Sequence, residues 1–288
     1  MLYAAECKVS DNLTDRSPYF IKKYGLLDST NLFALREFGS LPDGAVITAE
    51  KQTAGRGRMS RSWLSEGKGL YFTVVLKKAR KAEYYAAFSH LMSVSICMAL
   101  EKEGLAPQIK WPNDVLCAPP AGINMKIDAG HAQEMEKTEP ETEINSFPGK
   151  ICGILSQAYA GPHGLEGIVL GAGINCLQAA EDFTGLMYPA YSMKMLSGHE
   201  PDKEQLLKTV LDFFFARKPD FEQLGFPSIK NEYCSRCAFI GKEIKISVSI
   251  GSNIVKETVF AEKINSDGTL SVIRKGRRET ISAADILQ

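Results

Sequence analysis

QTAGRGRMSRSWLSEGKGLYFTVVL, residues 52–76, is the most informative stretch of this chain of 288 residues. In its first half, arginines alternate with small residues. The apolar run 70–76 at its end predicts a buried strand. Glycines let the backbone approach a ligand closely, and the N–H groups of such a turn can bind an anion. The arginines suit phosphate or carboxylate, and Trp63 offers a flat face for a ring. The stretch therefore predicts a loop that closes over a small ligand with anionic parts, although taken alone it also fits a solvated basic loop.

The overall composition is that of an ordinary globular protein. The chain has 34 Lys and Arg residues and 34 Asp and Glu residues, so its net charge favours neither nucleic acid nor a membrane surface as a partner. Neither a signal-peptide pattern nor an apolar run long enough to cross a membrane is found, and we expect a cytoplasmic protein. The length allows one large domain, or a main domain with a small one.

The seven cysteines are an odd and scattered set, which favours reduced thiols over a disulfide framework. Cys234-x-x-Cys237 is the one close pair. Zinc would need two more ligands, and no second pair accompanies it. We therefore interpret this pair as a coincidence of spacing.

A second polar motif, Asp28-Ser29-Thr30-Asn31, precedes an apolar run and predicts the start of a helix. Such residues either cap the helix or turn their hydroxyls and free N–H groups toward a neutral polar ligand. From this stretch alone, capping is the favoured interpretation.

Three further motifs lie at predicted strands. Lys110-Trp111-Pro112-Asn113-Asp114 presents a cation, an aromatic ring and an amide–carboxylate pair at a strand end, where open sheets place ligands. Lys150 opens a strand over 150–157. Gly171 and Gly173 leave one face of another strand, 166–175, open to something lying close to the backbone.

The remaining chain is predicted from periodicity. A strand covers 46–49, and helices cover 84–103, closed by Gly104, and 203–217, capped by Asp202. Prolines and glutamates over about 117–149 predict a mobile insertion that interrupts a hairpin. Short alternating strands at 243–250, 254–262, 269–274 and 277–282 suit a small SH3-like barrel.

Taken together, these motifs resemble those of the biotin protein ligases. The matching segments, in the family's order, are 28–31, 52–58 with Arg61 and Trp63, 110–114, 150–155 and 171–175. The resemblance implies an α+β fold: a class II aminoacyl-tRNA synthetase-like catalytic domain, with a mixed sheet and flanking helices, over 1–235, and an SH3-like barrel over 236–288. Some members carry an N-terminal DNA-binding domain; with about 20 residues before the first motif, we expect none here.

The resemblance also implies a two-step reaction. Biotin and Mg-ATP give biotinyl-5′-AMP, and the biotinyl group then passes to a lysine of a biotin carboxyl carrier domain, as in acetyl-CoA carboxylase. The implied catalytic residues are Lys150, Arg58 and Lys110. The implied biotin-binding residues are Ser29, Thr30, Asn31, Gln52, Gly55, Arg56, Gly57, Arg58, Lys150 and Gly153. The implied ATP-binding residues are Arg56, Arg61, Trp63, Lys110, Asn113 and Asn175, and Asp114 is the candidate for Mg²⁺.

The chain departs from the family pattern at three positions. Ser60 stands where the family has a glycine, Glu66 where it has a proline, and Gln157 where it has a glutamate. No cation of the motifs is missing, and we expect Ser60 to affect the rate at which the loop orders more than the activity.

Two other interpretations stay open. A lipoate protein ligase would share the fold and the chemistry. Met193-Lys194-Met195 resembles a biotin acceptor site, so the chain could instead be a biotinylated carrier, although no alternating strands flank that lysine. We expect a monomer or homodimer that binds no nucleic acid and no membrane.

Overall fold

The computed structural model of the protein describes residues 18–77, 84–119, 148–162, 164–186, 188–250, 253–282 and 284–287. Nearly all of the predicted insertion, 120–147, lies outside the described residues. The strands on either side of it, β5 (Asp114–Cys117) and β6 (Gly149–Gly161), are antiparallel neighbours. The insertion therefore does separate two strands that pair with each other.

A seven-stranded sheet organises the molecule, in the order β1-β2-β3-β7-β6-β5-β4. Only β1 and β2 run parallel, and the other neighbours are antiparallel. The remaining strands are β1 (Phe20–Leu27), β2 (Ala45–Gln52), β3 (Gly69–Lys77), β4 (Pro107–Lys110) and β7 (Gly164–Asn175). The apolar run that follows the arginine loop is therefore β3, in the interior of the sheet.

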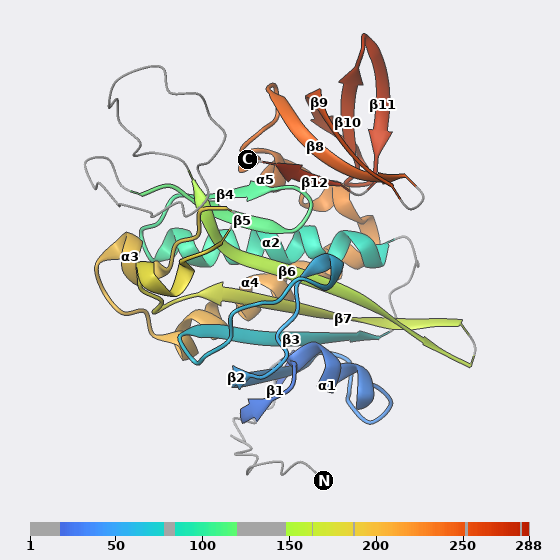
Figure 1. The fold of residues 1–288 in the computed structure, drawn as a ribbon. Coiled ribbons are helices and arrows are strands. Elements are labelled where there is room, and N and C mark those ends of the chain that lie inside the picture. Colours follow the sequence, from blue (N-terminus) through green and yellow to red (C-terminus); the bar gives the residue numbers. More distant parts are fainter. Residues whose placement is uncertain are drawn as a thin grey trace.

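Two long helices, α2 (Tyr84–Lys102) and α4 (Lys203–Leu224), cover one face of this sheet (Figure 1). Side chains of α2 such as Phe88 and Leu91 are fully buried there. The Asp202 carboxylate accepts hydrogen bonds from the N–H groups of Glu204 and Gln205, as the predicted cap requires. The helix runs seven residues past the predicted end, because Phe221 continues its apolar face.

The other face of the sheet is covered only in part. The short helix α1 (Thr30–Arg36) packs Ala34 against Ile47, Val75 and Val169 of β2, β3 and β7. Successive side chains of a strand point to opposite faces. Thr73, Gly171 and Gly173 therefore lie on the face of α1, and the region beside α1 is left open to a ligand.

A five-stranded antiparallel sheet follows, in the order β11-β10-β9-β8-β12, and lies beyond the β4 edge of the large sheet (Figure 1). Its strands are β8 (Glu243–Ile250), β9 (Asn253–Ile264), β10 (Leu270–Arg274), β11 (Arg277–Ile281) and β12 (Asp285–Leu287). The indole N–H of Trp111 donates to the Gly268 carbonyl at 3.0 Å and ties the two sheets together. The strand β12 and the short helix α5 (Lys230–Cys234) were not predicted.

The fold class predicted from the sequence is confirmed: a mixed sheet with flanking helices, followed by a small β unit. The boundary between residues 235 and 236 stays a prediction. Among the described residues, no helix is long and apolar enough to cross a membrane.

Candidate active site

A cavity of about 630 Å³ opens on the face of the large sheet beside α1. One end is polar and lies at the start of α1. The middle lies under the arginine loop, which contains the short turn η1 (Arg58–Ser60), and the other end is lined by apolar residues that follow β7. The predicted site residues that line it are Ser29, Thr30, Asn31, Gln52, Arg56, Gly57, Arg58, Arg61, Trp63, Asn113, Asp114, Lys150, Gly153 and Asn175.

The polar end is built from the first residues of α1. Ser29 occupies the N-cap position, but its side chain makes no capping hydrogen bond. The favoured capping interpretation is therefore wrong for Ser29. Ser29, Thr30 and Asn31 are at least 96% buried and line the cavity instead. The Thr30 N–H donates to the Gln52 side-chain carbonyl at 2.8 Å, so an orphan donor of the helix is satisfied from β2.

The middle of the cavity brings cations from two distant segments together. Arg58 donates to the Asn113 side-chain oxygen at 2.8 Å, and the Lys150 ammonium lies 2.8 Å from Asp114 Oδ1. Asn113 and Asp114 are adjacent, at the turn between β4 and β5. The turn predicted from Pro112 thus aligns one cation from the arginine loop with one from β6.

Trp63 lies across the glycines of the central strands. A Cβ at Gly173 would lie 2.3 Å from its indole nitrogen, and a Cβ at Gly153 would lie 2.8 Å from its ring. These glycines face each other in the β6–β7 register. The Lys150 ammonium lies 5.2 Å from the centroid of the ring, within cation–π range. The sequence predicted that Gly173 leaves room for a group close to the backbone, and the Trp63 indole lies there.

Asn175 presents only part of its amide to the cavity. Its NH₂ group donates to the Lys150 and Tyr191 carbonyls at 3.3 and 3.2 Å. Its oxygen has a single long contact, 3.4 Å, with the amide nitrogen of Gln178. Asn175 can therefore offer a ligand a hydrogen-bond acceptor.

Two predicted site residues do not line the cavity. Gly55 lies behind the loop, where a Cβ would meet Ser65 Oγ at 2.5 Å and the Trp63 carbonyl at 2.6 Å. Lys110 stands with its ammonium 5.3 Å from the ring centroid of Tyr188, and that ring does line the cavity. Gly55 thus allows the loop to pack closely on itself, and Lys110 contacts the Tyr188 ring that forms part of the cavity wall.

The apolar end was missed by the sequence analysis. It is formed by Phe183, Leu186, Tyr188, Pro189 and Ala190. These residues follow β7 without a repeating pattern, and the parallel bridge between Lys150 and Ala190 brings them to the cavity. Their proximity to β6 is a tertiary effect, so no local signal could reveal it.

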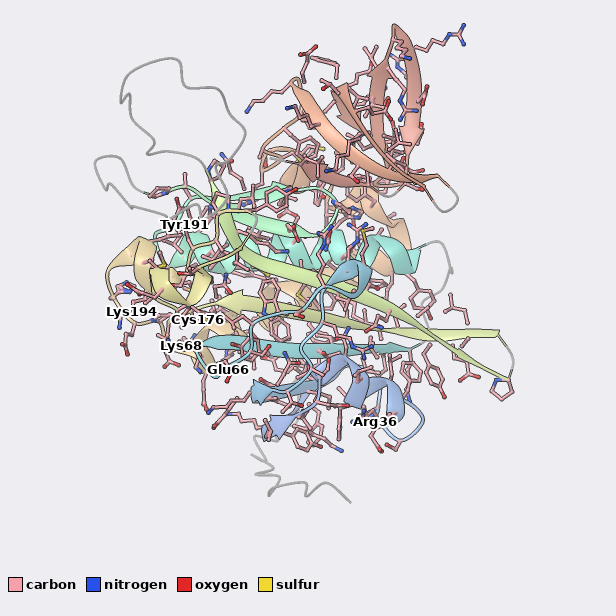
Figure 2. All side chains as sticks on the ribbon, in the orientation of Figure 1. Arg36, Glu66, Lys68, Cys176, Tyr191 and Lys194 are labelled. Carbon is pink, nitrogen blue, oxygen red and sulfur yellow. The ribbon has the colours of Figure 1, made fainter. Side chains whose placement is uncertain are left out.

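The alternative sites from the sequence analysis find little support in the geometry. Lys194 lies in the helix α3 (Met193–Ser197), at its outer edge in Figure 2, and pairs with Glu200 at 2.7 Å. It is not at a hairpin tip. The six described cysteines are free, and burial raises the pKa of the Cys117 and Cys176 thiols to about 12. Among the described residues, no group of three His, Cys, Asp or Glu side chains could hold a metal ion.

Comparisons with known proteins show what the chain resembles in sequence and in fold. A family model described as the Biotin/lipoate A/B protein ligase family matches residues 25–147. Over 248 residues, the chain is 29% identical to the bifunctional ligase/repressor BirA of Bacillus spizizenii, covering 85% of this chain and 66% of that protein. It is 28% identical over 268 residues to a biotin–acetyl-CoA-carboxylase ligase of Paracoccus denitrificans, covering 90% of this chain and 96% of that protein.

Among solved structures, the biotin protein ligase of Aquifex aeolicus in complex with biotin and ATP aligns with a TM-score of 0.68 and 20% identity. The alignment covers 93% of this chain and 97% of that one, so the two share a fold over nearly their whole length. By these matches, the chain is similar in sequence to members of the biotin/lipoate A/B protein ligase family and shares the fold of a solved biotin protein ligase.

Proposed function

We propose that the protein is an ATP-dependent biotin protein ligase. One observation carries the proposal: Arg58 and Lys150 contact the adjacent residues Asn113 and Asp114, and all four line one cavity that has polar and apolar walls. A neutral polar ring fits the end at Thr30 and Gln52. A flat base fits the end at Tyr188. The junction is where a carboxylate and a phosphate would meet.

In the first half-reaction, a biotin carboxylate oxygen attacks the α-phosphorus of ATP and pyrophosphate leaves. Both reacting groups are anionic, so they repel each other until cations lie between them. Lys150 and Arg58 supply that charge in fixed positions, and preorganised charge of this kind is often the largest contribution to a rate. Arg56 and Arg61 line the same cavity, and we assign to them the role of guiding the leaving pyrophosphate.

Mg²⁺ fits this donor set. It is usually bound by one or two carboxylates together with substrate phosphates. Asp114 is the only carboxylate among the described residues that line the cavity. Asp114 and the phosphate oxygens would hold the ion, which would screen the phosphate charge, and Asp114 would then exchange its ion pair with Lys150 for the metal.

In the second half-reaction, a lysine amine of the acceptor attacks the acyl carbonyl of biotinyl-5′-AMP, and AMP leaves. The acceptor that we propose is a biotin carboxyl carrier domain, as in acetyl-CoA carboxylase. The name of the Paracoccus relative supports this choice. The reaction would take place in the cytoplasm.

Biotin-dependent exchange between ATP and labelled pyrophosphate tests the first half-reaction, with lipoate as the parallel substrate. We expect exchange with biotin alone. Exchange with lipoate alone would assign the chain to the lipoate branch of the family. Folded protein that supports exchange with neither acid would contradict the proposal.

A further inference from the structure

We propose that Thr73, which does not line the cavity, is a positioning residue that makes the polar end select a ring bearing N–H donors. The inference rests on the proposed function, because it assigns the ring of biotin to that end. Thr73 lies on β3 and is fully buried. It joins a chain of side-chain hydrogen bonds that extends from β6 to the arginine loop.

A glycine makes the chain possible. Gly171 of β7 pairs with Thr73 of β3 on one side and with Leu155 of β6 on the other. A Cβ at Gly171 would lie 2.1 Å from Asn31 Oδ1, so only a glycine lets the Asn31 amide lie over the strand. Asn31 can therefore reach both neighbouring strands across β7.

The orientation of the Asn31 amide is fixed by what surrounds it. Its nitrogen lies 3.1 Å from the Leu155 carbonyl, which can only accept, and 2.9 Å from Gln157 Oε1. The NH₂ group must face these oxygens, so Oδ1 faces Thr73 Oγ1, at 2.6 Å. Because Oδ1 cannot donate, the single hydroxyl hydrogen of Thr73 goes to Asn31.

That assignment determines which oxygen accepts the hydroxyl hydrogen of Thr30. Thr73 Oγ1 and Thr30 Oγ1 lie 2.8 Å apart, and Thr73 has already used its hydrogen. Thr30 Oγ1 also lies 3.2 Å from Gln52 Oε1, but two hydroxyl oxygens 2.8 Å apart need a hydrogen between them, so the Thr30 hydroxyl donates to Thr73. Its oxygen is left with lone pairs only, so toward the cavity Thr30 can accept a hydrogen bond but cannot donate one.

The same logic orients Gln52 and Ser65. Gln52 Oε1 accepts from the Thr30 N–H, so its NH₂ group faces Ser65 Oγ at 2.9 Å, and Ser65 donates to the Trp63 carbonyl at 3.1 Å. Every group in the chain has a determined role. Thr30 therefore offers an acceptor, and Gln52, which also lines the cavity, keeps a second amide hydrogen to donate. A cyclic urea, with N–H groups beside a carbonyl, matches this pattern, whereas a dithiolane ring has no N–H donor.

Thr73→Val tests the proposal, because valine keeps the shape and removes the hydroxyl. Leaving Asn31 Oδ1 and the Thr30 hydroxyl without their partner should weaken biotin binding by roughly 10- to 100-fold. Isothermal titration with biotin alone measures the affinity, and pyrophosphate exchange measures KM for biotin and kcat separately. A positioning role predicts a raised KM with kcat within about threefold of wild type.

Two variants serve as controls. Thr73→Ser restores the hydroxyl and should restore the affinity. Thr48→Val removes a threonine hydroxyl from β2 that donates to the Tyr71 carbonyl at 2.8 Å, outside the chain of bonds, and should leave biotin affinity unchanged. A drop common to Thr48→Val and Thr73→Val would reflect a general loss of stability and would overturn the proposal.

The remaining outcomes also test the positioning role of Thr73. Folded Thr73→Val protein that binds biotin as wild type does would overturn the positioning role and leave the proposed function intact. If Thr73→Val does not fold, Asn31→Asp replaces it, since a carboxylate would face the Leu155 carbonyl and Gln157 Oε1 without a hydrogen to give. Wild-type affinity in Asn31→Asp would then overturn the proposal. Wild-type protein that neither binds biotin nor supports exchange would overturn the proposed function and this inference with it.

Discussion

Lys150 is the side chain on which the proposed chemistry depends most directly. Lys150→Ala should lower the rate of biotin-dependent pyrophosphate exchange on the order of 10²- to 10³-fold, because it removes a preorganised charge from the reacting groups. The melting temperature should change little, since the ammonium is partly exposed beside Asp114. Lys194→Ala removes a lysine from an ion pair outside the cavity and is the matched control. Wild-type exchange rates in Lys150→Ala would contradict the proposed role.

A substitution at Gly173 tests the position of the Trp63 indole. Gly173→Ala would place a methyl group 2.3 Å from the indole nitrogen, so the ring must leave its position. Overpacking of this kind costs about 1–3 kcal/mol. We expect a red shift of tryptophan emission, because Trp111, the other tryptophan, is buried elsewhere. Gly39→Ala, where the added methyl meets nothing, should leave the spectrum unchanged.

At the scale of single residues, the sequence predicts the chemistry of the site better than its supporting contacts. The arginines and the Asn113–Asp114 pair could be predicted because charge and turn geometry are local properties, whereas Lys150 was implied by the family resemblance. Thr73 could not, because a threonine in an apolar run is an ordinary strand residue. Its importance depends on Gly171 beside it, and that pairing is set by the sheet register.

At the scale of elements, the helix α4 offers a direct test of capping. Asp202→Ala removes the acceptor for the N–H groups of Glu204 and Gln205. The free energy of unfolding should fall by about 1 kcal/mol, the usual cost of losing an N-cap. Asp220→Ala, within the exposed part of the same helix, should change it by less. Urea unfolding measures both, and equal losses would contradict the capping role.

The two helix starts show why caps are hard to interpret from sequence. Asp202 and Ser29 both precede a helix, and both residue types are common caps. Asp202 caps α4, but Ser29 makes no capping bond at α1. At α1 the first N–H group, that of Thr30, is instead satisfied by Gln52 from β2. The contact from Gln52 thus helps to satisfy the start of α1, and the Ser29 side chain lines the cavity.

At the scale of the whole molecule, the resemblance of the motifs predicted the fold class and strand patterns predicted the small β unit, but the long-range arrangement came from packing. The apolar wall at Tyr188 and the short strand β12 depend on partners far along the chain, so their sequences carry no periodic signal. The contact between the two sheets also joins residues that are far apart in the chain. Trp111, inside a motif interpreted as part of the site, also holds the small sheet through the Gly268 carbonyl.

His90 lies at this junction and makes the stability of the whole molecule depend on pH. It is buried on α2 against the rings of Phe226 and Tyr233 and beside the turn at Gly268. Burial lowers the pKa of His90 to about 4, from 6.5, although the nearby Asp267 carboxylate acts in the opposite direction. The native state therefore keeps His90 neutral over a range in which the unfolded chain binds a proton.

The sign follows from proton uptake. As the pH falls below about 6.5, the unfolded state gains a proton that the folded state cannot take up until the pH reaches about 4. The free energy of unfolding should therefore fall across this window, by up to about 3 kcal/mol from His90 alone. His90→Phe keeps a ring in the aromatic contact and removes the titrating group, so its stability should fall less between pH 7 and pH 4 than that of wild type. His199→Gln, which changes an exposed histidine, should follow the wild-type curve. Urea unfolding at a series of pH values measures all three, and parallel curves for His90→Phe and wild type would show that His90 is not the group responsible.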